Sequence, residues 1–142
     1  MSATRILRPS PSYEATVPHH AEQADDDDRV TSVWLDGQPL LLQLSSYLRT
    51  TGEQVNAAER LRERIDKSAE SWTRWDATLH ADSSIDQATA EYADAEGTVW
   101  IFTYLVWPHL TLLATVAGVG PMVRDRDNWA LQAVRSIRLV TH

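Results

Sequence analysis

Segment 72–80 carries polar side chains at a spacing that could support acid–base chemistry. If this segment is a strand, alternation places four of them on one face: Arg74, Asp76, Thr78 and His80. Glu91, from the strand predicted next, joins that face in one choice of register. Carboxylates and imidazole transfer protons or hold metal ions, so Asp76, His80 and Glu91 are the candidate catalytic residues.

A solvated sheet face accounts for the same residues without catalysis. Neighbouring strands would add further polar side chains to it: Gln43, Ser45, Tyr47, Gln87 and Thr89. One face of an antiparallel sheet is commonly polar and exposed to water, and one sequence does not reveal the register between strands. The sequence therefore favours a protein that is not an enzyme, while a small hydrolase or isomerase using these residues stays open.

Motifs for other chemistries are absent. The five glycines never form a GxGxxG or P-loop pattern, and there is no GxSxG, HExxH or EF-hand sequence. The chain has no cysteine, which excludes thiolate zinc sites and a cysteine nucleophile. The composition of the N-terminal segment, with His19, His20 and Asp25 to Asp28, resembles that of a metal site. A solvated tail explains the same residues, and such a tail lacks the fixed geometry that a selective metal site needs. No cofactor and no metal are predicted.

Aromatic residues are the unusual component, because the chain has six tryptophans. The segment Thr98 to Trp107 reads as a strand with two apolar faces, one of which carries Trp100, Phe102 and Tyr104. A central strand of this kind needs cover on both sides. If helices leave one face open, these three residues are the candidate site for a protein partner or an apolar small molecule.

Length and composition indicate one globular domain. The chain has 142 residues, of which 43% are hydrophobic and 23% charged, close to globular averages. The formal net charge of -7 disfavours nucleic-acid binding, which needs clustered Lys and Arg. The N-terminus has no apolar stretch typical of a secretory signal, so a cytoplasmic location is expected. A homo-oligomer stays open.

The predicted organisation is a disordered acidic arm at residues 1–28 followed by a single α+β domain at 29–142. The arm is rich in proline and aspartate and shows no apolar periodicity. Beyond it, turn residues such as Asp36-Gly37 separate the predicted strands, which form an antiparallel sheet of about six strands. Their ranges are 29–35, 39–49, 72–80, 85–93, 98–107 and 110–119.

Two helices are expected around this sheet. The first follows the second strand over 51–69, with Thr51 as N-cap and Gln54 completing a capping box. Its remaining faces carry mixed charges, which is typical of a solvated helix surface. The second is C-terminal, from Asp125 or Asp127 to about Arg138.

The stretch from Thr98 to Val123 contains no charged residue and is long enough to span a membrane, so a membrane anchor is an alternative. Pro108-His109, four threonines and β-branched residues favour paired strands instead. The basic residues that follow are interleaved with aspartates, unlike the flank of a spanning helix.

The layout of the segment from Glu91 to Val140 resembles the PsbP-like fold family. The resemblance rests on the turn at Asp94 to Gly97, the strands TVWIFTYLVW and LTLLATVAGV, and the helix DNWALQAVRSIRL. With the preceding strands and helix it covers about two thirds of the chain. It implies a small αβα domain with a binding or accessory role, without an active site common to the family, and it carries over no functional residue.

The function predicted from the sequence is thus a non-enzymatic interaction module. It would bind a protein partner or an apolar ligand through the sheet, using its tryptophan-rich surface.

Overall fold

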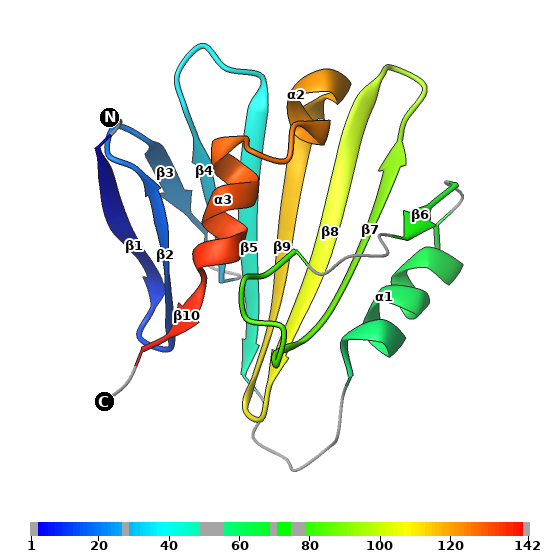
Figure 1. The fold of residues 1–142 in the computed structure, drawn as a ribbon, viewed down its shortest axis with the longest axis horizontal. Coiled ribbons are helices and arrows are strands. Elements are labelled where there is room, and N and C mark those ends of the chain that lie inside the picture. Colours follow the sequence, from blue (N-terminus) through cyan, green and yellow to red (C-terminus); the bar gives the residue numbers. More distant parts are fainter. Residues whose placement is uncertain (1–2, 27–28, 49–55, 69–70, 75–78, 141–142) are drawn as a thin grey trace.

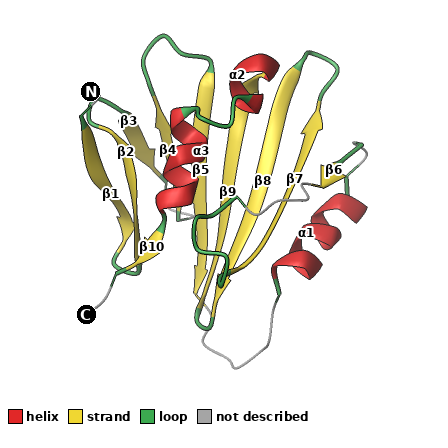
Figure 2. Ribbon diagram, viewed as in Figure 1, coloured by secondary structure: helices red, strands yellow, loops and turns green. Residues whose placement is uncertain are grey.

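The computed structural model describes residues 3–26, 29–48, 56–68, 71–74 and 79–140 (Figure 1). Within them the chain forms two antiparallel sheets and three helices (Figure 2). The predicted α+β class is confirmed, and so is the placement of one helix after the strand at 40–48 and another near the C-terminus.

The main sheet contains seven strands in the order β3-β4-β5-β9-β8-β7-β6. Their bounds are β3 Glu22–Asp25, β4 Val30–Trp34, β5 Leu40–Leu48, β6 Thr73–Arg74, β7 Asp86–Ala93, β8 Thr98–Trp107 and β9 Leu110–Val119. The bounds of β8 and β9 agree with the prediction residue for residue. β4 and β5 form the predicted hairpin, where Gly37 takes the positive φ of 79° that the turn requires.

The prediction of a disordered arm over residues 1–28 is wrong for residues 4–25. β1 (Thr4–Ser10) and β2 (Tyr13–Pro18) pair with the short β10 (Arg138–Leu139) in a second sheet, and β3 joins the main sheet. The physical reason is that every second side chain of β2 is apolar and buried: Tyr13, Ala15 and Val17 all point into the core. The polar residues around this alternation concealed it.

The main sheet has two different faces, defined here by the side chains of β8. On the α3 face, Val99, Ile101 and Leu105 join the larger core, with residues of the second sheet and of helix α3 (Trp129–Ser136). On the α1 face, Phe102, Tyr104 and Val106 pack against helix α1 (Ala57–Asp66). Helix α3 thus lies between the two sheets, and α1 lies on the opposite side of the main sheet.

Asparagine side chains cap both longer helices. The side-chain oxygen of Asn56 accepts from the backbone N–H of Glu59 at 2.7 Å, and that of Asn128 accepts from Leu131 at 2.8 Å. The predicted cap residues Thr51 and Gln54 lie outside the described residues. A short helix that the sequence did not predict, α2 (Gly120–Arg124), connects β9 to α3.

The predicted strand 72–80 is wrong in extent. Only Thr73–Arg74 forms β6, and residues 75–78 lie outside the described residues. Leu79 and His80 instead lie in the connection to β7 and are buried. This connection crosses to the α3 face, where Leu79 joins the larger core. Burial of the Leu79 side chain there stabilises Leu79 and His80 outside the sheet, in place of pairing with β7.

The predicted common polar face does not form. Gln43 pairs with Thr115 of β9, which pairs with Phe102, so Gln43 shares the α1 face. Gln87, Thr89 and Glu91 instead share the α3 face, because they pair with residues of β8 that point there. Equal spacing on separate strands therefore did not mean a common face.

No helix in the described part of the chain is long and apolar enough to cross a membrane. Residues 98–123, the proposed alternative anchor, form β8, β9 and the first four residues of α2.

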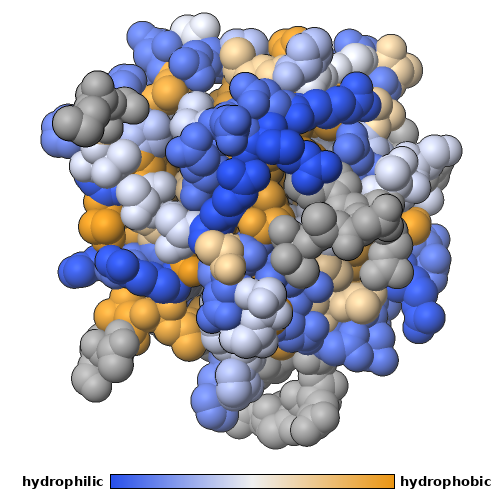
Figure 3. All heavy atoms as spheres, in the orientation of Figure 1, coloured by the Kyte–Doolittle hydropathy of each residue, from blue (hydrophilic) through white to orange (hydrophobic). Residues whose placement is uncertain are grey.

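The surface on the α3 side mixes hydrophobic and hydrophilic residues (Figure 3). Hydrophobic atoms gather at the lower left of the view, near β10. Among the described large hydrophobic side chains, Ile6 and Leu139 of the second sheet are 43% and 42% exposed. The second sheet therefore exposes scattered apolar residues in this region, and a cavity of about 340 Å³ lies beside the turn between β1 and β2.

The second sheet contains a doubly paired carboxylate. Glu14 accepts from Arg138 Nε at 2.6 Å and from Arg8 Nε at 2.9 Å, and thereby links β2 to its two neighbouring strands. These hydrogen bonds, first from Arg138 and then from Arg8, lower the pKa of Glu14 from its ordinary value of 4.5.

A pH-dependent stability follows from this pairing. Because the folded-state pKa lies below the unfolded value, the contribution of Glu14 is present above about pH 4.5 and is lost as the pH falls through the folded pKa. We expect Glu14→Gln to lower the melting temperature at pH 7 and to flatten its fall on acidification, measured by circular dichroism. Glu22→Gln, at an exposed position of β3, is the control; parallel acid curves for Glu14→Gln and the wild type would contradict this role.

Candidate functional site

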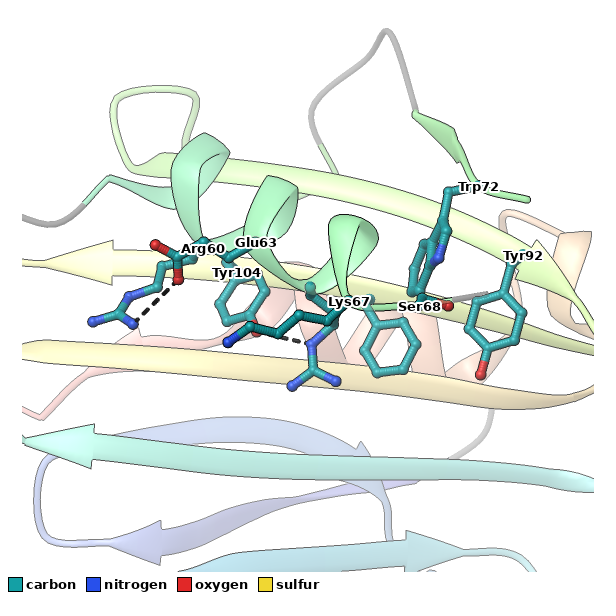
Figure 4. A pocket seen from close by; sticks show the side chains of 9 residues that line it. Arg60, Glu63, Lys67, Ser68, Trp72, Tyr92 and Tyr104 are labelled. Atoms are coloured by element: carbon teal, nitrogen blue, oxygen red, sulfur yellow. Dashed lines mark hydrogen bonds and ion pairs between the residues drawn. The ribbon is translucent and has the colours of Figure 1, made fainter. Parts of the chain in front are cut away.

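A cavity of about 410 Å³ lies between α1 and the α1 face of the sheet (Figure 4). Within the described part of the chain, its walls are formed by five residues from α1 and its C-terminal end and by four aromatic residues: Arg60, Glu63, Arg64, Lys67, Ser68, Trp72, Tyr92, Phe102 and Tyr104. Figure 4 shows Arg60 and Glu63 toward one end, with Trp72 and Tyr92 at the other. The volume falls within the usual range of small-molecule sites, about 300–1,000 Å³.

Helix α1 is positioned over this cavity by a narrow apolar contact. Ala57 and Leu61, one turn apart, are completely buried against Phe102 and its neighbours. The carboxylate of Asp86 on β7 accepts from the backbone N–H of Ala57 at 3.0 Å, which satisfies a free donor of the first turn. Arg60 and Arg64, each three positions after one of these two residues, line the cavity.

Four aromatic rings form a cluster on the α1 face, and three of them, Trp72, Tyr92 and Phe102, line the cavity. The Trp72 ring lies 4.5 Å from that of Tyr92 and 5.2 Å from that of Phe102, between ring centroids. The Tyr92 and Trp100 rings are parallel within 7° at 6.0 Å. Such pairs add stability beyond the area they bury and form rigid apolar walls. The indole N–H of Trp72 is buried and has no hydrogen-bond partner within the described residues.

Arg64 lies across this aromatic cluster. Its Nε donates to the Tyr104 hydroxyl oxygen at 2.9 Å, and its guanidinium carbon is 5.0 Å from the centre of the Phe102 ring. A guanidinium held over an aromatic face is attracted by the negative face of the ring. Because this hydrogen bond uses Nε, it fixes the position of the Arg64 guanidinium and does not use the two terminal nitrogens.

The charges around the cavity are predominantly positive. Among the lining residues that the structure describes are three cations and one anion, a net charge of +2 in a chain whose formal net charge is -7. Arg60 and Glu63 approach each other only to 3.8 Å, and both side chains are largely exposed, so this ion pair is weak. The cavity is therefore a positive region on an acidic protein.

A second cavity of about 310 Å³ adjoins the first, since Arg60 and Tyr104 line both. The other described residues that line it are Tyr47 of β5 and Thr111 of β9. Thr111 is only 4% exposed, and its hydroxyl has no hydrogen-bond partner in the part of the chain that the structure describes. Such a group carries a desolvation cost that a bound polar atom would offset.

Two of the three predicted binding residues line the first cavity. Phe102 and Tyr104 do so, although α1 reduces their exposure to 9% and 7%. Trp100 is half-buried, stacks on Tyr92 and donates from its indole N–H to Asp94 at 3.5 Å. The face that carries them is thus partly covered by α1, and the remaining open space lies along the helix.

The candidate catalytic residues are not assembled into a site within the described residues. Asp76 lies outside them. Both ring nitrogens of His80 are engaged, Nε2 with the Ile137 carbonyl at 2.6 Å and Nδ1 with the Asp82 backbone N–H at 3.0 Å. Glu91 accepts from Arg124 at 3.2 Å.

His80, in the connection that precedes β7, also lies beside the beginning of that strand, whereas Glu91 lies near its end. The backbone N–H of His80 donates to the Gln87 side chain at 2.8 Å. Gln87 precedes Glu91 by four strand residues, which span about 13 Å. In the same described part of the chain, no group of three His, Cys, Asp or Glu side chains is arranged to hold a metal ion.

The basic residues of α1 were missed as site residues. The mixed charges of the predicted helix indicate a solvated surface, whereas Arg60, Arg64 and Lys67 line the cavity. Their spacing of four and three places them on one side of the helix, next to the buried Leu61. The signal in the sequence was therefore the row of positive charges beside the apolar positions of the helix, Ala57 and Leu61.

Comparisons with known proteins show only the fold. No protein-family model matches the chain, and no curated protein matches it. A crystal structure from Bacteroides thetaiotaomicron VPI-5482 is similar, with a TM-score of 0.57 at 7% sequence identity. The match covers 99% of this chain and 49% of that one, so this chain spans about half the length of that protein.

Proposed function

We propose that this protein is a non-enzymatic binding module whose ligand is an apolar or aromatic small molecule. The ligand would occupy the cavity between α1 and the α1 face. The observation that carries the proposal is the cavity itself, with Trp72, Tyr92 and Phe102 as its rigid aromatic walls.

The arrangement of polar groups supports binding more than catalysis. His80 and Glu91, two of the predicted acid–base groups, have partners on the α3 face, across the sheet from the cavity. The PsbP-like resemblance also implies a binding or accessory role. A cavity of this size fits a small molecule better than the broad contact of a stable protein complex, which buries about 800 Å² on each partner.

The test is titration with N-phenyl-1-naphthylamine, a neutral aromatic fluorophore. We expect saturable one-to-one binding with increased probe fluorescence. Ser68→Phe places a ring at the cavity wall and should weaken binding by about tenfold or more. The added ring takes up cavity space, so the probe can bury less apolar area there.

Ala95→Phe is the matched control. Ala95 is exposed in the turn between β7 and β8, so this variant adds the same ring away from the cavity and should bind within about twofold of wild type. Circular dichroism confirms that both variants fold. Equal affinity of Ser68→Phe and wild type, or no saturable binding by the wild type, would refute the proposal.

A further inference from the structure

The cavity joins two chemically different surfaces. One wall is aromatic, formed by Trp72, Tyr92 and Phe102, and the wall from α1 is cationic. A ligand that matches only the aromatic wall would leave three positive side chains facing an uncharged surface. Electrostatic complementarity therefore constrains the ligand further than apolar shape does.

We propose that the natural ligand is an anion, in which a carboxylate, sulfonate or phosphate group is attached to a planar apolar body. This inference rests on the proposed binding function and adds the class of ligand. The anionic group is held by Arg60, Arg64 and Lys67, and the planar body lies against the aromatic cluster.

Arg64 is the central contact of this arrangement. Its Nε bond to Tyr104 and its position over Phe102 hold the guanidinium at the junction of the cationic and aromatic walls. A guanidinium that is fixed in advance loses little freedom when it binds an oxyanion, and its remaining N–H groups can form paired hydrogen bonds.

Arg60 places the anion toward the second cavity. It lines both cavities, as does Tyr104, so a ligand with its charge at this position can extend toward Thr111. The unpartnered hydroxyl of Thr111 then offers a hydrogen-bonding group to a polar atom beyond the charge. The ligand class is accordingly an elongated anion with one planar apolar end.

The test compares two probes that share one ring skeleton. 8-Anilino-1-naphthalenesulfonate carries a sulfonate that N-phenyl-1-naphthylamine lacks. We expect wild type to bind the sulfonate probe at least about tenfold more tightly, because charge-assisted hydrogen bonds are stronger than neutral ones. Added salt should weaken binding of the sulfonate probe and leave the neutral probe unaffected.

Variants assign this preference to the cavity. Arg64→Gln should lower the affinity for the sulfonate probe by more than it lowers the affinity for the neutral probe, and the triple variant with Arg60→Gln and Lys67→Gln should abolish the preference for the sulfonate. Arg62→Gln removes the same charge from an exposed position of α1 that does not line the cavity, and should change neither affinity. Glutamine keeps a favourable helix propensity, so the variants should fold.

The possible results separate the two claims. If both probes bind equally and the triple variant binds both like wild type, the anion assignment is wrong and the binding function stands. If the triple variant loses both probes in parallel, the basic side chains act through packing and the anion assignment is again wrong. If neither probe binds saturably, the proposed function itself fails.

Discussion

Leu61→Ala is expected to lower the free energy of unfolding by about 2–4 kcal/mol. Leu61 is completely buried and is one of the two fully buried residues by which α1 packs on Phe102, Tyr104 and their neighbours. Truncation removes most of a buried apolar side chain and leaves a void between α1 and the sheet. Urea denaturation, followed by circular dichroism and tryptophan fluorescence, measures the loss.

The same substitution should also weaken binding of N-phenyl-1-naphthylamine, because the helix that forms one wall loses its anchor. Arg62→Ala, one position further along α1 and exposed, is the control and should stay within about 0.5 kcal/mol of wild type. A Leu61→Ala protein with wild-type stability would mean that α1 does not pack on this face.

The second large effect is expected at Gly118, inside β9. A Cβ atom there would lie only 2.2 Å from the carbonyl oxygen of Pro39 and 3.2 Å from the Cα of Leu40. Both are backbone atoms, and the Pro39 carbonyl accepts from the Val119 N–H at 3.3 Å. No rotamer change relieves this contact, so β5 and β9 must separate locally. We expect Gly118→Ala to cost about 3 kcal/mol.

Gly97→Ala is the comparison. Gly97 has a φ of +85°, but its Cβ position is open, so only the backbone strain of about 1 kcal/mol applies. Thermal and urea unfolding of both variants should place Gly118→Ala clearly below Gly97→Ala. The reverse order would contradict the close approach of β5 and β9.

Local patterns predicted the centre of the sheet well. β8 and β9 were found because long runs of β-branched and aromatic residues are bounded by turn residues, and both signals are local. The same holds for the Asp36-Gly37 hairpin. Gly118 shows the limit, since its place within the predicted strand 110–119 does not reveal that the Pro39 backbone passes too close for a side chain.

Polar surroundings hid the N-terminal strands. Residues 4–25 contain Arg5, Arg8 and Glu14, which resemble the composition of a solvated tail. In the structure, Arg8 pairs with Glu14, and Arg5 donates to the Ala21 carbonyl at 2.8 Å, so these charges are compatible with an ordered sheet. The alternation of Tyr13, Ala15 and Val17 was the signal of β2, but it extends over only one short strand.

The candidate site depended on contacts between distant segments. Phe102 and Tyr104 were predicted from their own strand, whereas Arg64 reaches Tyr104 only because α1 crosses to β8, forty positions along the chain. The separation of Glu91 and His80 likewise depends on strand register and on where the 79–85 connection lies. Periodicity within one segment contains no information on either relation.

The most direct test of the central claim, that the cavity beneath α1 is the binding site, uses the indole N–H signals of the six tryptophans in a two-dimensional ¹⁵N–¹H NMR spectrum. During titration with N-phenyl-1-naphthylamine, the Trp72 signal, assigned by Trp72→Phe, should shift most. Trp129, whose indole N–H donates to Gln38 at 3.2 Å and which lies on the helix of the opposite face, should not move. A largest shift at Trp129, or no shift at Trp72 at saturation, would contradict the claim.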